Sequence, residues 1–341
     1  MSDSQVTRVE EHVKHTHIGG QAVIEGVMMR GKYNWAIAVR KPDGEIHVEE
    51  HDLVSGAKKH EWMRWPIVRG CVALVETFSL AMKAFTISAE MSGEGEEEQL
   101  SGKEISLSLV MGGGLAILLF IVAPAVLTNF ITRTSAAESP FLWNGVDGLL
   151  RVAAFFAYIW AISRMEEIQR VFRYHGAEHK VIHTFEHDLP LETPVIQKWS
   201  THHMRCGTSF LFMVMIIAIL VFSLVPVRAT AAALGLSGTI GILIVAIVSR
   251  VVLLPVVAGL AYEVTVKWAG NHSENPFVKV LLWPGLQMQR MTTGEPDDSM
   301  VEVAVAAVTP VIERERREES GEMAAEEAPA EDALADSPLP I

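Results

Sequence analysis

The sequence is poor in cysteine: Cys71 and Cys206 are the only two, and they lie far apart. Because no Cys-x-x-Cys pair exists, the chain has neither the disulfide framework of a small secreted domain nor the paired ligands of a zinc ribbon. It also lacks a sustained basic patch with interleaved aromatic residues, so we expect no nucleic-acid partner. The first 17 residues contain no apolar segment, which argues against a cleavable signal peptide.

Negative charge is plentiful but local. The net charge is −13, and much of the acidity lies in residues 94–98 and 318–336, among glycine, alanine, serine and proline. Segments of this composition stay solvated because they have too little apolar surface to bury. We therefore predict disordered tails over residues 1–17 and 311–341, and an acidic linker over residues 92–104.

Long apolar segments dominate the rest of the chain, since half of the 341 residues are hydrophobic. A transmembrane helix needs about 20 consecutive apolar residues. Residues 105–132, 141–163 and 209–227 each meet that requirement, and a fourth apolar stretch follows. We therefore predict a mainly α-helical, polytopic membrane protein with about four transmembrane helices, whose membrane domain spans residues 105–310. The lipid bilayer is then its first partner.

Two of the four spans contain charged residues. In the second, Asp147 and Arg151 lie one helical turn apart and can pair. In the fourth, Arg250 admits two interpretations: a helix over residues 232–249 with the arginine at the membrane surface, or a helix over residues 241–262 with the arginine buried. We favour the first, because a side chain that reaches the surface from a helix end costs less than a charge in mid-bilayer.

The basic residues predict the orientation in the membrane, because cytoplasmic loops carry an excess of lysine and arginine. The loops after the first and third spans contain one arginine each. The segment between the second and third spans contains many more basic residues, namely Arg164, Arg170, Arg173, Lys180, Lys198 and Arg205. We therefore expect this His-rich segment, residues 164–208, to face the cytoplasm together with both termini, in a multi-pass protein of the cytoplasmic membrane.

A small β-containing module precedes the membrane domain, over residues 18–65, on the cytoplasmic side. Residues 35–40 and 45–49 are typical of strands. Residues 41–44, Lys-Pro-Asp-Gly, give a strong turn signal between them, because proline fixes φ and glycine accepts a positive φ. The module is too small to be a secure domain alone.

Two further helices are expected outside the spans. Residues 66–91 are apolar but carry charges at seven-residue spacing, on one helical face: Arg69, Glu76 and Lys83. That stripe favours an amphipathic or interfacial helix over one buried in lipid. After the last span, Asp297 fits the N-cap of a short helix over residues 300–308, which Pro310 ends.

The His-rich segment contains His175-Gly176-Ala177-Glu178-His179, an H-x-x-E-H motif. On a helix, His175 and His179 lie on one face, where two neutral imidazoles can bind one divalent ion. Glu178 lies on the flank of that face, as a general base for water activated by the ion or as an orienting group for a ligand. The same motif occurs in the inverted zinc peptidases.

The third ligand has several candidates. If the helix continues, Glu186 falls on the same stripe as the two motif histidines. A second polar group, residues 201–208, precedes the third span and can return His203 or Cys206 towards the first. These ligand types favour a divalent metal, with zinc as the first choice. The alternative is a purely structural cluster of hydrogen-bonded side chains.

Other side chains are weaker candidates. Glu25 lies between small and apolar residues and either reaches the site or forms a salt bridge, the more usual fate of a partly buried carboxylate. Arg205 lies next to Cys206 and would favour its thiolate form. Glu76 is a further candidate because of the resemblance described next. Three histidines in the polar N-terminal tail are expected to be adventitious: His12, His15 and His17.

Several segments resemble those of the bacterial YqhQ family. Residues 19–30 (GGQAVIEGVMMR) are similar to its opening signature, and later pieces agree: Arg69-Gly70 with Glu76, YHGAEHK at 174–180, RCGTSF at 205–210 and PGLQ at 284–287. The resemblance covers residues 18–310. It implies a membrane protein predicted to be a metal-dependent enzyme of unknown reaction, and it supports His175, Glu178 and His179 as site residues. The family has His-Pro where this chain has His203-Met204, which loosens the expected turn but keeps the candidate ligand.

Three functions are compatible with these features. The leading hypothesis is a metal-dependent hydrolase with a cytoplasm-facing site, in which Glu178 activates water and the substrate is a peptide or is lipid-linked. The second is a non-enzymatic membrane scaffold or biogenesis factor, whose β module and C-terminal helix bind a membrane-protein or peptide partner. The third is a metal or ion transporter, which ranks last because the first and third spans contain no ionisable residue.

Overall fold

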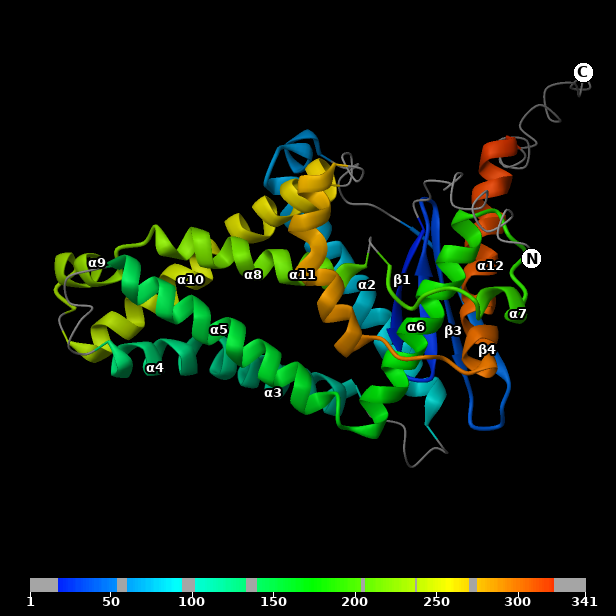
Figure 1. The fold of residues 1–341 in the computed structure, drawn as a ribbon, viewed down its shortest axis with the longest axis horizontal. Coiled ribbons are helices and arrows are strands. Elements are labelled where there is room, and N and C mark those ends of the chain that lie inside the picture. Colours follow the sequence, from blue (N-terminus) through cyan, green and yellow to red (C-terminus); the bar gives the residue numbers. More distant parts are fainter. Residues whose placement is uncertain are drawn as a thin grey trace, which may run out of the picture.

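The structure is a computed structural model that describes residues 18–53, 60–93, 102–132, 140–203, 206–236, 238–269 and 275–321. Figure 1 shows a sheet with its covering helices at one end and a bundle of long helices extending from it. The expectations for residues 1–17, for residues 322–341 and for most of the acidic linker fall outside the described residues.

A four-stranded antiparallel sheet forms the N-terminal part, with its strands in the order β1-β2-β3-β4. The strands are β1 (Gly19–Val23), β2 (Gly26–Arg30), β3 (Asn34–Arg40) and β4 (Ile46–Asp52). The turn predicted between β3 and β4 is confirmed: Gly44 has a φ of 89° and donates its N–H to the carbonyl of Lys41 at 2.9 Å. The glycine-rich opening segment forms the hairpin of β1 and β2.

Helices cover both faces of this sheet. α2 (Val68–Ser92) covers one face, and α6 (Glu166–Glu186) and α12 (Asp298–Ser320) cover the other. Successive residues of a strand point to opposite faces, so Ile37 of β3 packs with α2 whereas Ala38 packs with α6 and α12. The sheet is therefore buried on both sides, and α6 is held firmly against it.

α12 is longer than the sequence predicts. Its start is confirmed, because the side chain of Asp297 accepts the N–H of Met300 at 3.0 Å. The helix continues past Pro310 to Ser320, so the predicted end at Pro310 is wrong, and residues 311–320 are helix and not tail. A proline inside a helix removes one hydrogen bond. Buried apolar side chains on both sides of it pack against the sheet and offset that loss.

The second part of the fold is a bundle of apolar helices. It contains α3 (Gly102–Ile117), η3 (Leu118–Val122), α4 (Ala123–Ile131), α5 (Pro140–Ile162), α8 (Gly207–Ser223), α9 (Val227–Ala233), α10 (Thr239–Tyr262), η4 (Glu263–Ala269) and α11 (Pro276–Thr292). Short helices η2 (Glu61–Arg64) and α7 (Thr193–Ile196) lie in the connections. Within the described residues, four helices are long and apolar enough to cross a membrane, or five if the bent pair α8 and α9 is one span. The mainly helical organisation with about four candidate spans agrees with the sequence, but the predicted span over residues 209–227 qualifies only together with α9.

α2 is one of those four by length and composition, although the sequence predicts an amphipathic or interfacial helix. Figure 1 places α2 between the sheet and the bundle. Its first turns contact α10, where a Cβ atom at Gly70 would lie 2.9 Å from Cα of Gly259. Arg69, from the predicted charged stripe, forms an ion pair with Glu263. α2 therefore contacts both the sheet and the bundle, and its interfacial placement stays a prediction.

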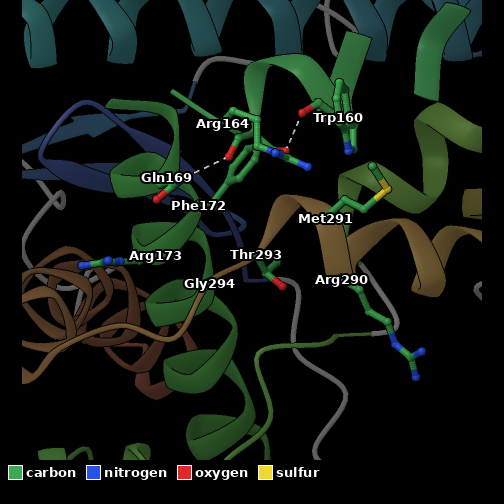
Figure 2. A pocket seen from close by; sticks show the side chains of 10 residues that line it. Trp160, Arg164, Gln169, Phe172, Arg173, Arg290, Met291, Thr293 and Gly294 are labelled. Carbon is green, nitrogen blue, oxygen red and sulfur yellow. Dashed lines mark hydrogen bonds between the residues drawn. The ribbon is translucent and has the colours of Figure 1, made fainter. Parts of the chain in front are cut away.

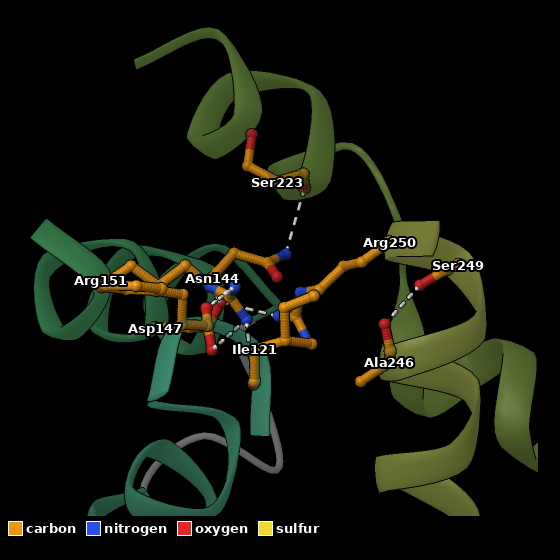
Figure 3. A network of polar contacts seen from close by, with 9 residues as sticks. Ile121, Asn144, Asp147, Arg151, Ser223, Ala246, Ser249 and Arg250 are labelled. Atoms are coloured by element: carbon orange, nitrogen blue, oxygen red, sulfur yellow. Dashed lines mark hydrogen bonds and ion pairs between the residues drawn. The ribbon is translucent and has the colours of Figure 1, made fainter. Parts of the chain in front are cut away.

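The last span differs from the helix that the sequence predicts. α10 runs unbroken through Arg250, whose side chain is buried within it, so the favoured interpretation with Arg250 at the membrane surface is wrong. Arg250 donates to Oδ2 of Asp147 at 2.6 Å, and Arg151 donates to the same oxygen at 2.8 Å. Figure 3 shows these three side chains meeting between α5 and α10. The shared carboxylate of Asp147 compensates for burial of the guanidinium group of Arg250. A prediction made from one helix alone cannot include that partner.

Candidate metal centre

The H-x-x-E-H motif lies on the buried half of α6. Tyr174, Ala177 and Val181 of this helix pack into the apolar core that the sheet and α12 complete. His175 and His179 lie on a neighbouring face, one turn apart, with ring centroids separated by 4.4 Å. The core therefore fixes the rotation of α6 and turns both imidazoles towards the segment that precedes α8.

Backbone carbonyls fix the orientation of both rings. Nδ1 of His175 lies 2.8 Å from the carbonyl oxygen of Thr292, and Nδ1 of His179 is hydrogen-bonded to the carbonyl of Thr201. Since a carbonyl only accepts, each neutral imidazole has its proton on Nδ1 and its lone pair on Nε2. Nε2 of His179 is buried without a partner among the described residues, and Nε2 of His175 lies 3.2 Å from Sγ of Cys206.

Cys206 completes a group of three potential ligand atoms. Its Sγ and one nitrogen from each of His175 and His179 lie within 4.8 Å of one another. Imidazole nitrogen and thiolate sulfur are preferred ligands of zinc, and three protein ligands leave a fourth coordination position. Burial lowers the pKa of His179 to about 2, so this imidazole is neutral at physiological pH, the form that binds a metal. The three side chains fit a divalent ion with the preferences of zinc.

Glu178 lies beside these three side chains. Its carboxyl group is buried, accepts a hydrogen bond from the backbone N–H of Gly20, and keeps Oε2 without a partner among the described residues. Burial raises the pKa of Glu178 to about 8, and the neighbouring charge of His175 acts in the opposite direction. A carboxyl group with a pKa near neutrality can both accept and return a proton.

Gly20 allows β1 to approach α6 at Glu178. A Cβ atom at position 20 would lie 2.8 Å from Cγ and from Cδ of Glu178 and 2.8 Å from the carbonyl oxygen of Met28. We expect Gly20→Ala to destabilise the fold by roughly 1–3 kcal/mol, the usual cost of overpacking, measured as a lower unfolding temperature in detergent. Gly19→Ala is the matched control, because a Cβ there meets nothing within 4 Å. Equal unfolding temperatures for the two variants would contradict the close approach.

A second group of potential ligands adjoins the first. His183, Glu186 and His203 also place three ligand atoms within 4.8 Å of one another. Glu186 and His203, the candidates for a third ligand, thus lie together, with Nε2 of His203 3.2 Å from Oε2 of Glu186. His183 is not among the ligands predicted from the sequence, although it follows His179 by one helical turn. Its i, i+4 spacing is the signal that finds it.

The remaining candidates from the sequence lie elsewhere. Glu25 occupies the turn between β1 and β2, with a φ of 52°, and forms a salt bridge with Arg170 of α6. Glu76 belongs to α2, on the other side of the sheet from α6. Arg205 lies outside the described residues, so its effect on Cys206 stays a prediction.

A cavity of about 420 Å³ opens near the motif, where α5 ends, α6 begins and α11 ends. Figure 2 shows Arg164 beside Trp160, with Arg173 and Arg290 extending in different directions around the cavity. None of these arginines has a carboxylate partner among the described residues. Gly294 lines the cavity and also touches the motif, because a Cβ atom at Gly176 would lie 1.9 Å from its carbonyl oxygen.

Comparison with known proteins identifies a family of unknown function. The sequence profile of a family described as "Protein of unknown function (DUF1385)" matches residues 65–314. The "Uncharacterized protein YqhQ" of Bacillus subtilis (strain 168) is 32% identical over 317 residues, which cover 89% of this chain and 95% of that protein. No solved structure matches the chain significantly. The resemblance to the YqhQ family is thereby confirmed.

Proposed function

We propose that this chain, which belongs to the DUF1385 family of proteins of unknown function, is a metal-dependent hydrolase that acts at a membrane surface. One observation carries the proposal. Nε2 of His175, Nε2 of His179 and Sγ of Cys206 converge next to Glu178, whose carboxyl group is buried and keeps an oxygen without a partner among the described residues. A purely structural polar cluster would be expected to satisfy such atoms with hydrogen bonds.

The metal-binding role falls to His175, His179 and Cys206. Their nitrogen and sulfur atoms favour zinc among the common divalent ions. The carbonyls of Thr292 and Thr201 hold the two rings in the tautomer that leaves Nε2 as a ligand. An ion bound there supplies two things to a hydrolysis: it lowers the pKa of a water molecule and it polarises the bond to be cleaved.

Glu178 takes the role of general base. Its Oε2 accepts the proton that the attacking water loses, while the N–H of Gly20 holds the carboxylate in place. The same carboxyl group then returns that proton to the leaving group, so water adds across the cleaved bond and the side chain is restored.

The substrate class follows from the surroundings of the site. The cavity in Figure 2 lies at the end of α5, a candidate span, and has three arginines around it. Arginine and tryptophan at this level are typical of a membrane–water interface. We infer a lipid-linked or peptide substrate that carries negative charge near the bilayer. The excess of basic residues around α6 supports a cytoplasm-facing site with both termini on that side.

Metal content tests the proposal directly. The full-length protein is purified in detergent through a tag without histidine, and bound metals are measured by elemental mass spectrometry. We expect at least one equivalent of zinc, iron or manganese per chain, and the loss of one equivalent in His175→Ala/His179→Ala. His47→Ala/His51→Ala is the matched control, since it removes two histidines of β4 that hydrogen-bond Glu49 instead.

Absence of metal would favour the scaffold hypothesis. If the well-folded wild type stays metal-free after reconstitution with each of these ions, the hydrolase proposal fails. The leading hypothesis would then be a non-enzymatic protein whose sheet and α12 bind a partner. The charged residues of α5 and α10 give little support to a transporter, because Asp147, Arg151 and Arg250 pair with one another.

A further inference from the structure

Three side chains next to the proposed centre form a second set of ligands. His183, Glu186 and His203 offer two imidazoles and one carboxylate, with ligand atoms within 4.8 Å of one another. Glu186 and His203 are buried, and His203 lies in contact with Glu186 at 3.2 Å. Two histidines and one carboxylate are a ligand set that proteins use for divalent ions in catalytic sites.

The surrounding structure fixes these ligands as firmly as the first three. Nε2 of His183 lies 2.8 Å from the carbonyl of His202, and its ring stacks on Trp199 with an interplanar angle of 9°. The N–H of His203 donates to Oε1 of Gln289 at 2.9 Å, and Nε2 of Gln289 donates to the carbonyl of His203 at 2.8 Å. Such support from outside the ligand set is typical of metal sites, because it orients the ligands before the ion arrives.

The two ligand sets are adjacent. Ring centroids are 4.4 Å apart between His175 and His179, 5.7 Å between His179 and His203, and 4.6 Å between His203 and His183. The four imidazoles thus form one continuous row along α6 and the segment before α8. Two ions bound to these sets would therefore be neighbours, the arrangement that two-metal hydrolases use.

We propose that His183, Glu186 and His203 bind a second divalent ion, so that the protein holds a two-metal centre. The inference deepens the proposed hydrolase function and rests on it for the first ion. The two positions differ in chemistry, because only the first contains sulfur. The thiolate position favours zinc, whereas the nitrogen and oxygen position also suits manganese or iron(II).

Cobalt(II) separates the two positions by spectroscopy. Full-length, metal-free protein in detergent is titrated with cobalt(II) while its absorption spectrum and cobalt content are recorded. A cobalt–thiolate pair absorbs in the near ultraviolet by charge transfer, and a nitrogen and oxygen site does not. We expect two equivalents per chain, with the charge-transfer band from one of them. Cys206→Ala should remove that band while the second ion remains bound.

The decisive variant changes only the second position. In His183→Asn/Glu186→Gln, cobalt should fall from two equivalents to one while the charge-transfer band keeps its full intensity. Glu186→Gln alone is the milder variant, with weaker binding of the second ion expected, and serves if the double variant fails to fold. His47→Ala/His51→Ala controls for the loss of histidine and should still bind two equivalents. Circular dichroism verifies that each variant is folded.

Each contrary result has its own meaning. One equivalent in the wild type, with the charge-transfer band present, overturns the second site and leaves the proposed hydrolase intact. Two equivalents in both the wild type and the folded variants at His183 and Glu186 overturn the assignment, because the second ion then binds elsewhere. No cobalt at either position removes both the two-metal centre and the hydrolase proposal.

Discussion

Replacing Glu178 by glutamine is expected to reduce hydrolysis by about 10²–10⁴-fold, the usual contribution of a general base, while the protein stays folded and metal-loaded. Glutamine keeps the volume of the side chain, and its amide oxygen can still accept the hydrogen bond from Gly20. It cannot accept the proton from water. Turnover is measured in liposomes, on whichever member of a panel of fluorogenic peptides and anionic lipid esters the wild type cleaves.

The control for this prediction lies on the same helix. Glu167→Gln makes the same chemical change in the exposed first turn of α6, so it should leave both turnover and metal content unchanged. Metal content of the Glu178→Gln protein is measured on the sample used for turnover. Full activity in that variant would contradict the role of Glu178 as base. Loss of metal together with activity would show that Glu178 is a ligand instead.

The part of this site that lies on one helix could be predicted from the sequence. The spacing of His175, Glu178 and His179 puts them on adjacent faces of any helix, whatever the rest of the chain does. Cys206 is a different case. It lies 31 residues beyond His175, so its approach to the two histidines depends on the path of the segment before α8. The side chain of Gln289 of α11 holds that segment by hydrogen bonds to the backbone of His203. No local sequence pattern predicts this contact.

The orienting groups could not have been predicted at all. The carbonyls of Thr292 and Thr201 select the tautomers of His175 and His179, but every residue has a carbonyl. Only the tertiary fold decides which carbonyl faces which ring. The approach of Gly20 to Glu178 is intermediate, because a glycine in a strand can indicate close contact without indicating its partner.

Two predictions made from local sequence are wrong, those for Arg250 and Pro310. Both residues contact parts of the chain that lie far away in the sequence. Arg250 was expected at the membrane surface because a lone charge in a span is costly, yet Asp147 from α5 neutralises it. Pro310 was expected to end a helix, yet packing of α12 on the sheet carries the helix through it. In both cases the local preference is worth a few kcal/mol, and tertiary contacts of similar size reverse it.

The second large effect is expected at that buried charge cluster. Asp147→Asn should destabilise the bundle by roughly 3–5 kcal/mol, the usual loss when one partner of a buried ion pair is removed. The reason is that Asp147 serves two guanidinium groups, so its loss leaves both Arg151 and Arg250 without their counter-ion. Arg151 retains its bonds to the carbonyls of Phe120 and Ile121 in η3, but those are neutral acceptors.

Three variants separate this effect from that of an ordinary ion pair, with stability measured as the fraction of monodisperse protein after heating in detergent. Arg250→Met should be milder than Asp147→Asn, because it leaves a neutral pair of Asp147 and Arg151. Glu302→Gln breaks a surface pair with Arg40 in which the carboxylate is 57% exposed, against 4% for Asp147. Its effect should stay within about 1 kcal/mol. If Arg250→Met destabilises the bundle as much as Asp147→Asn does, the cluster depends on the cation itself and not on the balance of charge.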